Sequence, residues 1–468
     1  MKLRHGWLTA IVTLMTTSFV SQCDMPERHL LKSKYPKIMT FNLLHPRDQI
    51  IAVMERIYGR NMTTTSGGNI SVKDENNHIW ITPARVDKGS LRRQDIVLVN
   101  PDGKPEGLHP PSSENPFHRS IYEVRPDIRA IIHAHPSALV SFSICSQVPE
   151  TRLFPESWHV CGKVAFARYD VPGSQALGAT IAAEFASDLQ PNCVVLENHG
   201  IVVGGVDLAD AFKRFETLEF TAQTHIYAKQ LGAIETLGME QIALSQTPRN
   251  LLPECQPRTP TSRGKELRKE ICDFVHRAYL HGLMTSTEGT FSARIDDDAF
   301  MITPAFVDRR ELRLEDMVII RDGQRPENRL PSRAVRLHAA IYEAHPEINA
   351  IANAMPVHAS AFCVSDFPLD TRTIPESYLF LKDVRTIPFE DLFGDCKNVA
   401  TLVTPANPVV LLRHNGVLIA GRTILDAFDR LEVLEATATA IINSRALGPI
   451  SPMNDQVIED LLAAFPGV

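Results

Sequence analysis

The sequence predicts an α/β protein with two tandem α/β/α sandwich domains, each with a mainly antiparallel central sheet covered by helices. Three observations support this fold class. The chain has 468 residues, 44% apolar and 22% charged, which is enough for two domains that each bury a core. Short apolar runs bounded by turn residues alternate with longer segments of helical periodicity. Motifs of the first half also recur in the second half in the same order.

The elements of the first half follow from their apolar patterns. Residues 47–58 carry apolar side chains at helical spacing, so they predict an amphipathic helix. Two further helices are expected, at residues 116–124 and 208–231. The predicted strands span residues 70–72, 78–81, 95–99, 127–132 and 193–196. Hairpin-linked strands followed by covering helices indicate a mainly antiparallel sheet between helical layers.

An internal repeat sets the domain boundaries. Residues 81–84 (Ile-Thr-Pro-Ala) recur at 302–305, and residues 155–157 (Pro-Glu-Ser) recur at 375–377. Residues 245–264 contain four prolines among polar residues, a composition typical of a linker. We therefore expect a leader, a first domain, a linker and a second domain at residues 1–42, 43–244, 245–264 and 265–468.

Three histidines of the first copy form a candidate metal site. His133 and His135 lie two residues apart at the end of a predicted strand, so both rings point to the same face. His199 follows another predicted strand. Three imidazoles with an open position suit a catalytic divalent metal, most readily Zn²⁺, with Co²⁺ or Mn²⁺ as alternatives. The alternative interpretation is that the rings are hydrogen-bonded core histidines.

The second copy lacks the candidate ligands. The three histidines are replaced by Asn353, Met355 and Asn415. Three other residues near the proposed site are also replaced: Asn69, Ser113 and Glu114 become Thr290, Arg333 and Ala334. His118 and Glu156 persist as His338 and Glu376, which favours a structural role for them. The pattern predicts a catalytic first copy and a non-catalytic second copy.

Five motifs follow one another in the first copy: Ser-Gly-Gly-Asn-Ile-Ser at 66–71, Ile-Thr-Pro at 81–83, Pro-Ser-Ser-Glu at 111–114, His-Ala-His-Pro at 133–136 and Glu-Asn-His-Gly at 197–200. In this order they resemble the class II aldolase/adducin family, and in particular the fuculose- and rhamnulose-phosphate aldolases. The resemblance covers about residues 43–232.

The resemblance implies roles for further residues. Glu114 would be the general acid and base, and Gly68, Asn69, Ser112 and Ser113 would bind a substrate phosphate.

Two positions depart from the family pattern. Arg85 stands where the family usually has glycine, and it is either an anion ligand or an ordinary surface residue. His159 aligns with a tyrosine that acts as an acid from a neighbouring subunit in the aldolases, and histidine can also donate a proton near neutral pH.

The expected function is that of a metal-dependent aldehyde-lyase. It would cleave a ketose phosphate by a retro-aldol reaction through a metal-stabilised enediolate. A sugar-phosphate epimerase, a dehydratase and a sugar-acid decarboxylase are alternatives on the same scaffold, and a non-catalytic adducin-like assembly module is an alternative of another class. Glu114 favours an aldolase or dehydratase, because the epimerases resembled here use aspartate at that position.

Charge and composition limit the partners. A net charge of −7 without a basic cluster argues against nucleic acid, and the repeats contain no membrane-spanning stretch. The expected partners are a phosphorylated sugar or related anion and further copies of the chain, with two chains forming a pseudo-fourfold ring. Irregularly spaced cysteines and a phosphosugar substrate predict a cytoplasmic protein, although residues 2–20 imitate a signal peptide and leave export open.

Overall fold

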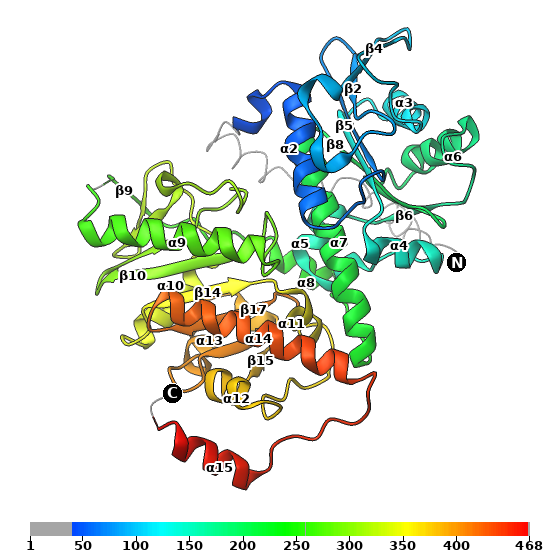
Figure 1. Ribbon diagram of the computed structural model, residues 1–468. Helices are drawn as coiled ribbons and strands as arrows, with labels where there is room; N and C mark the ends of the chain where they lie inside the picture. The colour runs from blue at the N-terminus through cyan, green and yellow to red at the C-terminus, as the bar shows by residue number, and fades with distance from the viewer. Residues whose placement is uncertain (1–39, 258, 467–468) are drawn as a thin grey trace, which may run out of the picture. The chain divides into compact units, whose positions relative to one another are not determined.

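The computed structural model describes residues 40–257 and 259–466, so the signal-like part of the predicted leader lies outside the described residues. Two large sheets are present, each covered by helices (Figure 1). The first has eight strands in the order β4-β3-β2-β1-β5-β8-β7-β6, and the second has seven in the order β12-β11-β10-β14-β17-β16-β15. Parallel pairing in these sheets is confined to β6 with β7 and β15 with β16. This architecture confirms the predicted α/β class with mainly antiparallel sheets.

Every element predicted for the first copy is present, but the strand predicted at residues 127–132 spans Ala130–Ala134, and further elements, such as those at residues 137–144 and 200–205, were not predicted. The helices are α2 (Pro46–Gly59), α3 (Asn115–Val124), α4 (Ser137–Ile144), α5 (Pro155–Cys161), α6 (Gln175–Ala186), α7 (Leu208–Leu231) and α8 (Met239–Ser245). The strands are β1 (Asn69–Lys73), β2 (Ile79–Ile81), β3 (Val97–Val99), β4 (Pro105–Glu106), β5 (Ala130–Ala134), β6 (Ala165–Ala167), β7 (Cys193–Leu196) and β8 (Gly200–Gly205).

The second copy repeats this order of elements. Its helices are α9 (Ser262–Leu280), α10 (Val335–Ala344), α11 (Val357–Phe362), α12 (Pro375–Leu381), α13 (Lys397–Leu402), α14 (Ile424–Ser444) and α15 (Asp455–Ala464). The strands from the linker onward are β9 (Glu254–Cys255), β10 (Thr290–Asp296), β11 (Ala299–Ile302), β12 (Val318–Arg321), β13 (Arg325–Pro326), β14 (Ala350–Ala354), β15 (Arg385–Ile387), β16 (Val409–Leu412) and β17 (Val417–Gly421). Over residues 40–257 and 259–466, no helix combines the length and apolarity needed to cross a membrane.

Part of the segment predicted as a linker packs against the second copy. Within it, β9 pairs in parallel with β13, and α9 already begins at Ser262. The Asn250 side chain donates a hydrogen bond of 2.8 Å to the Pro331 carbonyl oxygen. Proline and polar residues therefore mark an irregular connection here, but one that packs against the second domain.

Each face of the first sheet has its own core. One core joins the sheet to α2, α4, α5 and α7, and its buried side chains include Ile50, Ile132 and Phe215. The other joins it to α3 and α6 through side chains such as Phe117 and Ile181. Because β5 contributes to both cores, its buried run Ala-Ile-Ile-His-Ala is almost entirely apolar, as expected for a strand covered on both sides.

Strand pairing around β5 positions the predicted site. In the antiparallel register, His133 on β5 lies opposite Asn69 on β1 and opposite Val202 on β8. Two glycines allow this close packing. A Cβ on Gly68, whose φ is +70°, would lie 2.7 Å from the His133 carbonyl oxygen, and one on Gly200 would lie 2.6 Å from the Ala134 carbonyl oxygen. Larger residues at these positions would force β1 or β8 away from the end of β5.

A buried carboxyl group anchors the helix that follows the His-Ala-His-Pro motif. Glu219 on α7 accepts hydrogen bonds from the backbone N–H groups of Ala138 at 3.4 Å and Leu139 at 3.2 Å, in the first turn of α4. Gln223 donates a third bond of 2.7 Å. Burial raises the pKa of Glu219 to about 7, although the three hydrogen bonds act in the opposite direction.

Stability should therefore depend on pH through Glu219. The pKa of Glu219 is higher in the folded state than in the unfolded state. The contribution of the protonated Glu219 side chain to the free energy of unfolding is therefore complete below about pH 4.5 and is lost as the pH rises through about 7. Glu219→Gln stays neutral. Between about pH 5 and pH 8 we expect the thermal midpoint of the wild type to fall relative to that of the variant. The corresponding loss in the free energy of unfolding is at most about 3 kcal/mol. Circular dichroism melts at both pH values measure this, with the exposed Glu240→Gln as control. Parallel midpoints for wild type and Glu219→Gln would contradict it.

Candidate metal centre

The three predicted ligands meet at one end of the first sheet. His133 is fully buried on β5, His135 follows the end of that strand, and His199 lies in the turn between β7 and β8. One nitrogen from each ring lies within 4.8 Å of the other two. Nε2 of His133 and Nε2 of His135 are 2.9 Å apart. Among the described residues this is the one group of histidine, cysteine and acidic side chains close enough to hold a metal ion.

A backbone contact orients the buried ring. Nδ1 of His133 donates a hydrogen bond of 2.9 Å to the Ile201 carbonyl oxygen on β8. This bond leaves the lone pair of Nε2 directed at the other two histidines, as a metal ligand requires. Burial, reinforced by nearby charge, lowers the pKa of His135 to about 3 and that of His199 to about 4. Both rings are therefore neutral at pH 7, which is the protonation state that binds metal.

Glu114 lies directly beside the three rings. It is the residue that precedes the first turn of α3, and it is 8% exposed. Its Oε2 is 3.1 Å from Nε2 of His133, and its Oε1 is 3.3 Å from Nε2 of His199. Burial alone would raise the pKa of Glu114, but its interactions with His133, and then with His199 and Asn69, outweigh burial and hold the pKa well below its usual range.

This arrangement of donors fits a divalent metal ion. Three imidazoles converge from two strand ends, and the Oε1 atom of Glu114 is buried without a hydrogen-bond partner among the described residues. A buried oxygen of this kind is uncommon unless a water, ion or ligand satisfies it. The donor set has the nitrogen ligands of a catalytic zinc site, with a carboxylate available for proton transfer.

A buried hydrogen-bond chain holds Glu114 in place. The Asn69 side chain donates a bond of 2.7 Å to Oε2 of Glu114, and its Oδ1 contacts Nε2 of His118. His118 Nδ1 in turn contacts the hydroxyl of Ser71 at 2.7 Å, which lies 2.8 Å from the hydroxyl of Tyr122. Burial lowers the pKa of His118 to about 3, so this ring is neutral.

Sequence reasoning missed two members of this chain, Ser71 and Tyr122. The signal was present in the repeat, because the equivalent Ser292 and Tyr342 make the same contacts with His338 in the second copy. His338 then contacts Oδ1 of Asn353 at 2.6 Å. The second copy retains this hydrogen-bond chain without the candidate metal ligands, which is consistent with the structural role expected for His118.

The predicted phosphate ligands differ in their surroundings. The Asn69 amide already contacts Glu114 and His118. Ser112 is buried, and its hydroxyl accepts a bond of 3.3 Å from the Glu114 backbone N–H. Ser113 is exposed at the start of the same turn. Gly68 approaches the backbone of His133, as described above. The structure therefore gathers these residues around Glu114, with Ser113 open to a ligand.

Arg85 lies on an exposed turn with φ of +59°. This left-handed conformation favours glycine, which explains why glycine is usual there in the family pattern. The equivalent Phe306 has φ of +58° and is also exposed.

His159 lies on α5, and its Nε2 contacts the Ser245 hydroxyl at 2.8 Å. The same helix contacts the second copy, because Glu156 forms an ion pair of 3.2 Å with Arg333. The predicted acid therefore belongs to a helix that faces the degenerate site, where Arg333 also pairs with Glu288 at 2.9 Å.

Three known proteins are similar to part of this chain. The L-fuculose phosphate aldolase of Methanococcus maripaludis is 34% identical over 183 residues, which are 39% of this chain and 96% of that protein. The 3-oxo-tetronate 4-phosphate decarboxylase of Haemophilus influenzae is 29% identical over 184 residues, 38% of this chain and 86% of that protein. A solved L-fuculose 1-phosphate aldolase is 30% identical, with a TM-score of 0.39 over 42% of this chain and 93% of that chain.

The sequence profile of the class II aldolase and adducin N-terminal domain family matches two regions, residues 48–226 and residues 269–442. Together the two matches span more than half of the 468 residues. The chain therefore belongs to the class II aldolase and adducin family, with two tandem copies of its domain, of which the second lacks the three candidate ligand histidines.

Proposed function

We propose that the chain is a metal-dependent lyase that cleaves a ketose phosphate by a retro-aldol reaction at the site of the first copy. The observation that carries the proposal is the convergence of three imidazoles with the buried carboxylate of Glu114. Zn²⁺ is the proposed metal, held by His133, His135 and His199. A bound divalent ion supplies Lewis-acid stabilisation of the negative charge that develops on the substrate oxygens.

Glu114 would move the proton. In the cleavage direction its carboxylate accepts the proton of the substrate hydroxyl while the carbon–carbon bond breaks, which releases an aldehyde. The group then returns a proton to the remaining three-carbon fragment. Asn69 keeps Oε2 of Glu114 engaged at 2.7 Å, so Oε1 is the oxygen free for this transfer.

The remaining site residues bind and orient the substrate in this proposal. Ser112, Ser113, Gly68 and Asn69 surround the phosphate, and Arg85 contributes a guanidinium that can pair with it bidentately. His159 lies on a helix that faces the degenerate site and contacts Ser245, so this proposal gives it no role at the metal centre.

The cellular setting is part of the same proposal. The seven described cysteines are all free, which suits a cytoplasmic protein. The active form would be a homo-oligomer.

Decarboxylation of a phosphorylated sugar acid is the second candidate reaction. Similarity to a 3-oxo-tetronate 4-phosphate decarboxylase favours it, and the same Lewis-acid chemistry would stabilise the charge left after loss of carbon dioxide. Assays with ketose phosphates and with 3-oxo acid phosphates separate the two reactions by product: an aldehyde in one case and carbon dioxide in the other.

The first prediction from the proposed function concerns His133→Asn. The second copy already has Asn353 in the same strand register, with a contact of 3.4 Å to the Val417 carbonyl oxygen, so the fold should tolerate the change. We expect the wild type to contain about one equivalent of divalent metal per chain by elemental analysis, and the variant to lose both metal and turnover. His78→Asn, in a surface turn, is the control. A folded wild type that binds no divalent metal would contradict the metal site.

The second prediction separates proton transfer from metal binding. Glu114→Gln keeps the size of the side chain and can still meet Asn69, but it cannot accept a proton. We expect kcat to fall by a factor of about 10² to 10⁴, the usual range for loss of a general acid or base, with the metal content unchanged. Glu123→Gln, at the exposed end of α3, should leave kcat unaltered. An unchanged kcat in Glu114→Gln would show that Glu114 is not the general acid or base.

The third prediction tests Arg85. If its guanidinium binds the substrate phosphate, Arg85→Ala should raise KM by a factor that corresponds to about 1.5–3 kcal/mol, with a smaller change in kcat. Arg85→Lys should keep part of the affinity because the charge remains. Lys104→Ala, in another exposed turn, serves as the control. An unchanged KM would show that Arg85 is an ordinary surface residue that does not bind the substrate.

A further inference from the structure

Ser143 holds the turn that carries the third candidate ligand. It lies in the last turn of α4 and is fully buried. Its hydroxyl donates a hydrogen bond of 2.6 Å to the Leu196 carbonyl oxygen, at the end of β7, and accepts one of 2.9 Å from the His199 backbone N–H. The Ser143 carbonyl oxygen accepts a further bond of 3.4 Å from the Asn198 N–H. The last turn of α4 is therefore bonded to both sides of the turn between β7 and β8.

The position of the His199 ring depends on this turn. Asn198 has a left-handed φ of +53°, and the His199 N–H also reaches the Leu196 carbonyl oxygen at 3.1 Å. On the other side, a Cβ on Gly200 would lie 2.7 Å from Cδ2 of His135, so the turn packs tightly against the second candidate ligand. Metal donors must be held within about 0.5 Å of their productive positions. A contact that fixes the backbone of His199 therefore acts on its imidazole.

The second copy forms the same turn around a different side chain. The bond from the Asn198 N–H to the Ser143 carbonyl oxygen matches the bond from His414 to Cys363, so Cys363 is the equivalent of Ser143. His414 also has φ of +53°, like Asn198. The fold therefore makes this turn with a cysteine in place of the serine.

The hydroxyl bridge is not repeated in the second copy, over the residues that the structure describes. The Cys363 sulfur donates to the Gly416 carbonyl oxygen at 3.1 Å, while the Asn415 N–H donates to the Leu412 carbonyl oxygen at 2.9 Å. Asn415 occupies the place of His199. The bridge is thus absent from the copy that lacks the candidate ligands.

Another buried serine of the first copy behaves differently. Ser157 on α5 is 1% exposed, and its hydroxyl lies 2.7 Å from that of Thr221. The equivalent Ser377 and Thr437 keep this contact at 2.6 Å. A hydroxyl pair needed for folding alone is expected to persist in both copies, as this one does. The Ser143 hydroxyl instead follows the histidines.

The other end of α4 is fixed as well. This helix begins at Ser137, two residues after His135, and Glu219 on α7 accepts bonds from the N–H groups of its first turn, as described above. One end of α4 is therefore held beside His135, and the other end holds His199. The helix sets the separation of the two ligands.

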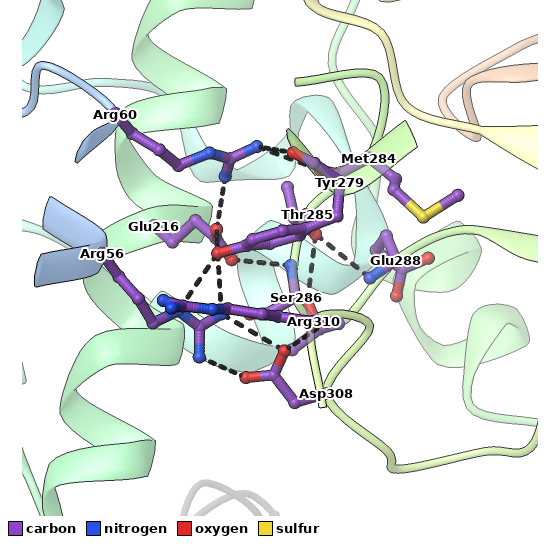
Figure 2. A network of polar contacts seen from close by, with 11 residues as sticks. Arg56, Arg60, Glu216, Tyr279, Met284, Thr285, Ser286, Glu288, Asp308 and Arg310 are labelled. Atoms are coloured by element: carbon purple, nitrogen blue, oxygen red, sulfur yellow. Dashed lines mark hydrogen bonds and ion pairs between the residues drawn. The ribbon is translucent and has the colours of Figure 1, made fainter. Parts of the chain in front are cut away.

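The helix that holds α4 is itself anchored one turn earlier (Figure 2). Glu216 on α7 is 1% exposed, and its Oε2 accepts a bond of 2.7 Å from the Ser286 backbone N–H. Its Oε1 accepts bonds from the Tyr279 hydroxyl at 3.0 Å and from Nη1 of Arg60 at 2.5 Å. A buried carboxylate with three donors is costly to displace, so α7 is a firm support for Glu219.

A neighbouring ion pair extends this support. Arg56 on α2 pairs with Asp308, with Nη1–Oδ2 and Nη2–Oδ1 distances of 2.6 and 3.2 Å. The corresponding helix of the second copy, α14, is more exposed. The Glu432 side chain, in the place of Glu216, is 42% exposed, and Leu447 is 90% exposed where Leu231 is 3% exposed. Firm anchoring therefore accompanies the copy that has the three histidines.

We propose that Ser143 is a positioning residue of the metal centre, which acts through the backbone of His199 and sets that ligand relative to His135. The inference rests on the proposed function in one respect, that the three histidines bind a metal ion. Without the hydroxyl bridge, the turn after β7 would relax, and the His199 nitrogen would leave the tetrahedral arrangement that Zn²⁺ requires.

Metal affinity tests this role without any assay of turnover. Ser143→Cys copies Cys363 with little change in side-chain volume, so the variant should fold. We expect its dissociation constant for Zn²⁺, measured by competition with a chromophoric chelator, to rise about 10- to 100-fold, the usual effect of losing a contact that orients a metal ligand. Ser143→Ala removes the hydroxyl without adding a sulfur and should give a similar rise.

Ser157→Cys is the matched control, because it makes the same substitution at another buried serine of the same copy. It should lower the thermal midpoint of the metal-free protein and leave the dissociation constant for Zn²⁺ unchanged. An equal loss of affinity in Ser157→Cys and Ser143→Cys would show that the effect comes from general destabilisation, and it would overturn the positioning role.

Co²⁺ reports the geometry of the site directly, since its visible absorption depends on the arrangement of the ligands. At saturating Co²⁺, the spectrum of Ser143→Cys should differ from that of the wild type in band position or intensity, and the spectrum of Ser157→Cys should not. Circular dichroism of the metal-free proteins confirms that each variant is folded.

The outcomes separate this role from the proposed reaction. Unchanged Zn²⁺ affinity and an unchanged Co²⁺ spectrum in both Ser143 variants would overturn the positioning role and leave the lyase standing. A wild type that binds Zn²⁺ but cleaves no sugar phosphate, with the expected loss of affinity in Ser143→Cys, would reject the reaction and support the positioning role. A wild type that binds no metal would overturn both.

Discussion

The pairing of β5 between β1 and β8 is the constraint on which the site depends. One antiparallel register sets His133 opposite Asn69, and the other lets Nδ1 of His133 donate to the Ile201 carbonyl oxygen. The first contact brings the partner of Glu114 to the ring, and the second aims the ring at His135 and His199. A shift of one residue in either register would turn His133 to the opposite face of the sheet.

The second copy shows that the scaffold does not need the three candidate ligand histidines. Its sheet has the same register, with Thr290 opposite Asn353, and the chain of Ser292, His338 and Tyr342 is intact. In the second copy Ala334 replaces the buried carboxylate of Glu114, and the three histidines beside it are replaced as well.

The contact between the copies combines polar specificity with apolar burial. Arg56, Glu216 and Asp308 form ion pairs whose desolvation offsets much of their attraction, so they set orientation more than they stabilise. Buried side chains such as Leu231 and Phe220, packed against the second copy, supply the hydrophobic contribution.

The sequence by itself determined the repeat, the extents of the long helices and the three converging histidines. These features depend on local periodicity and on spacing along one chain, which neighbouring residues encode. It was less accurate at the predicted strand 95–99, which begins at Val97 because Asp95 caps the preceding turn by accepting a bond of 2.8 Å from the Arg92 N–H.

Only the tertiary structure decided which distant residues meet. It linked Ser71 and Tyr122 to the support of Glu114, turned the helix of His159 toward Arg333, and gave the two copies different contact faces. No local pattern encodes such contacts, since they depend on how sheets and helices formed far apart in the chain pack together. The repeat made the two copies equal in sequence order, and packing made them unequal in exposure, as Leu231 and Leu447 show.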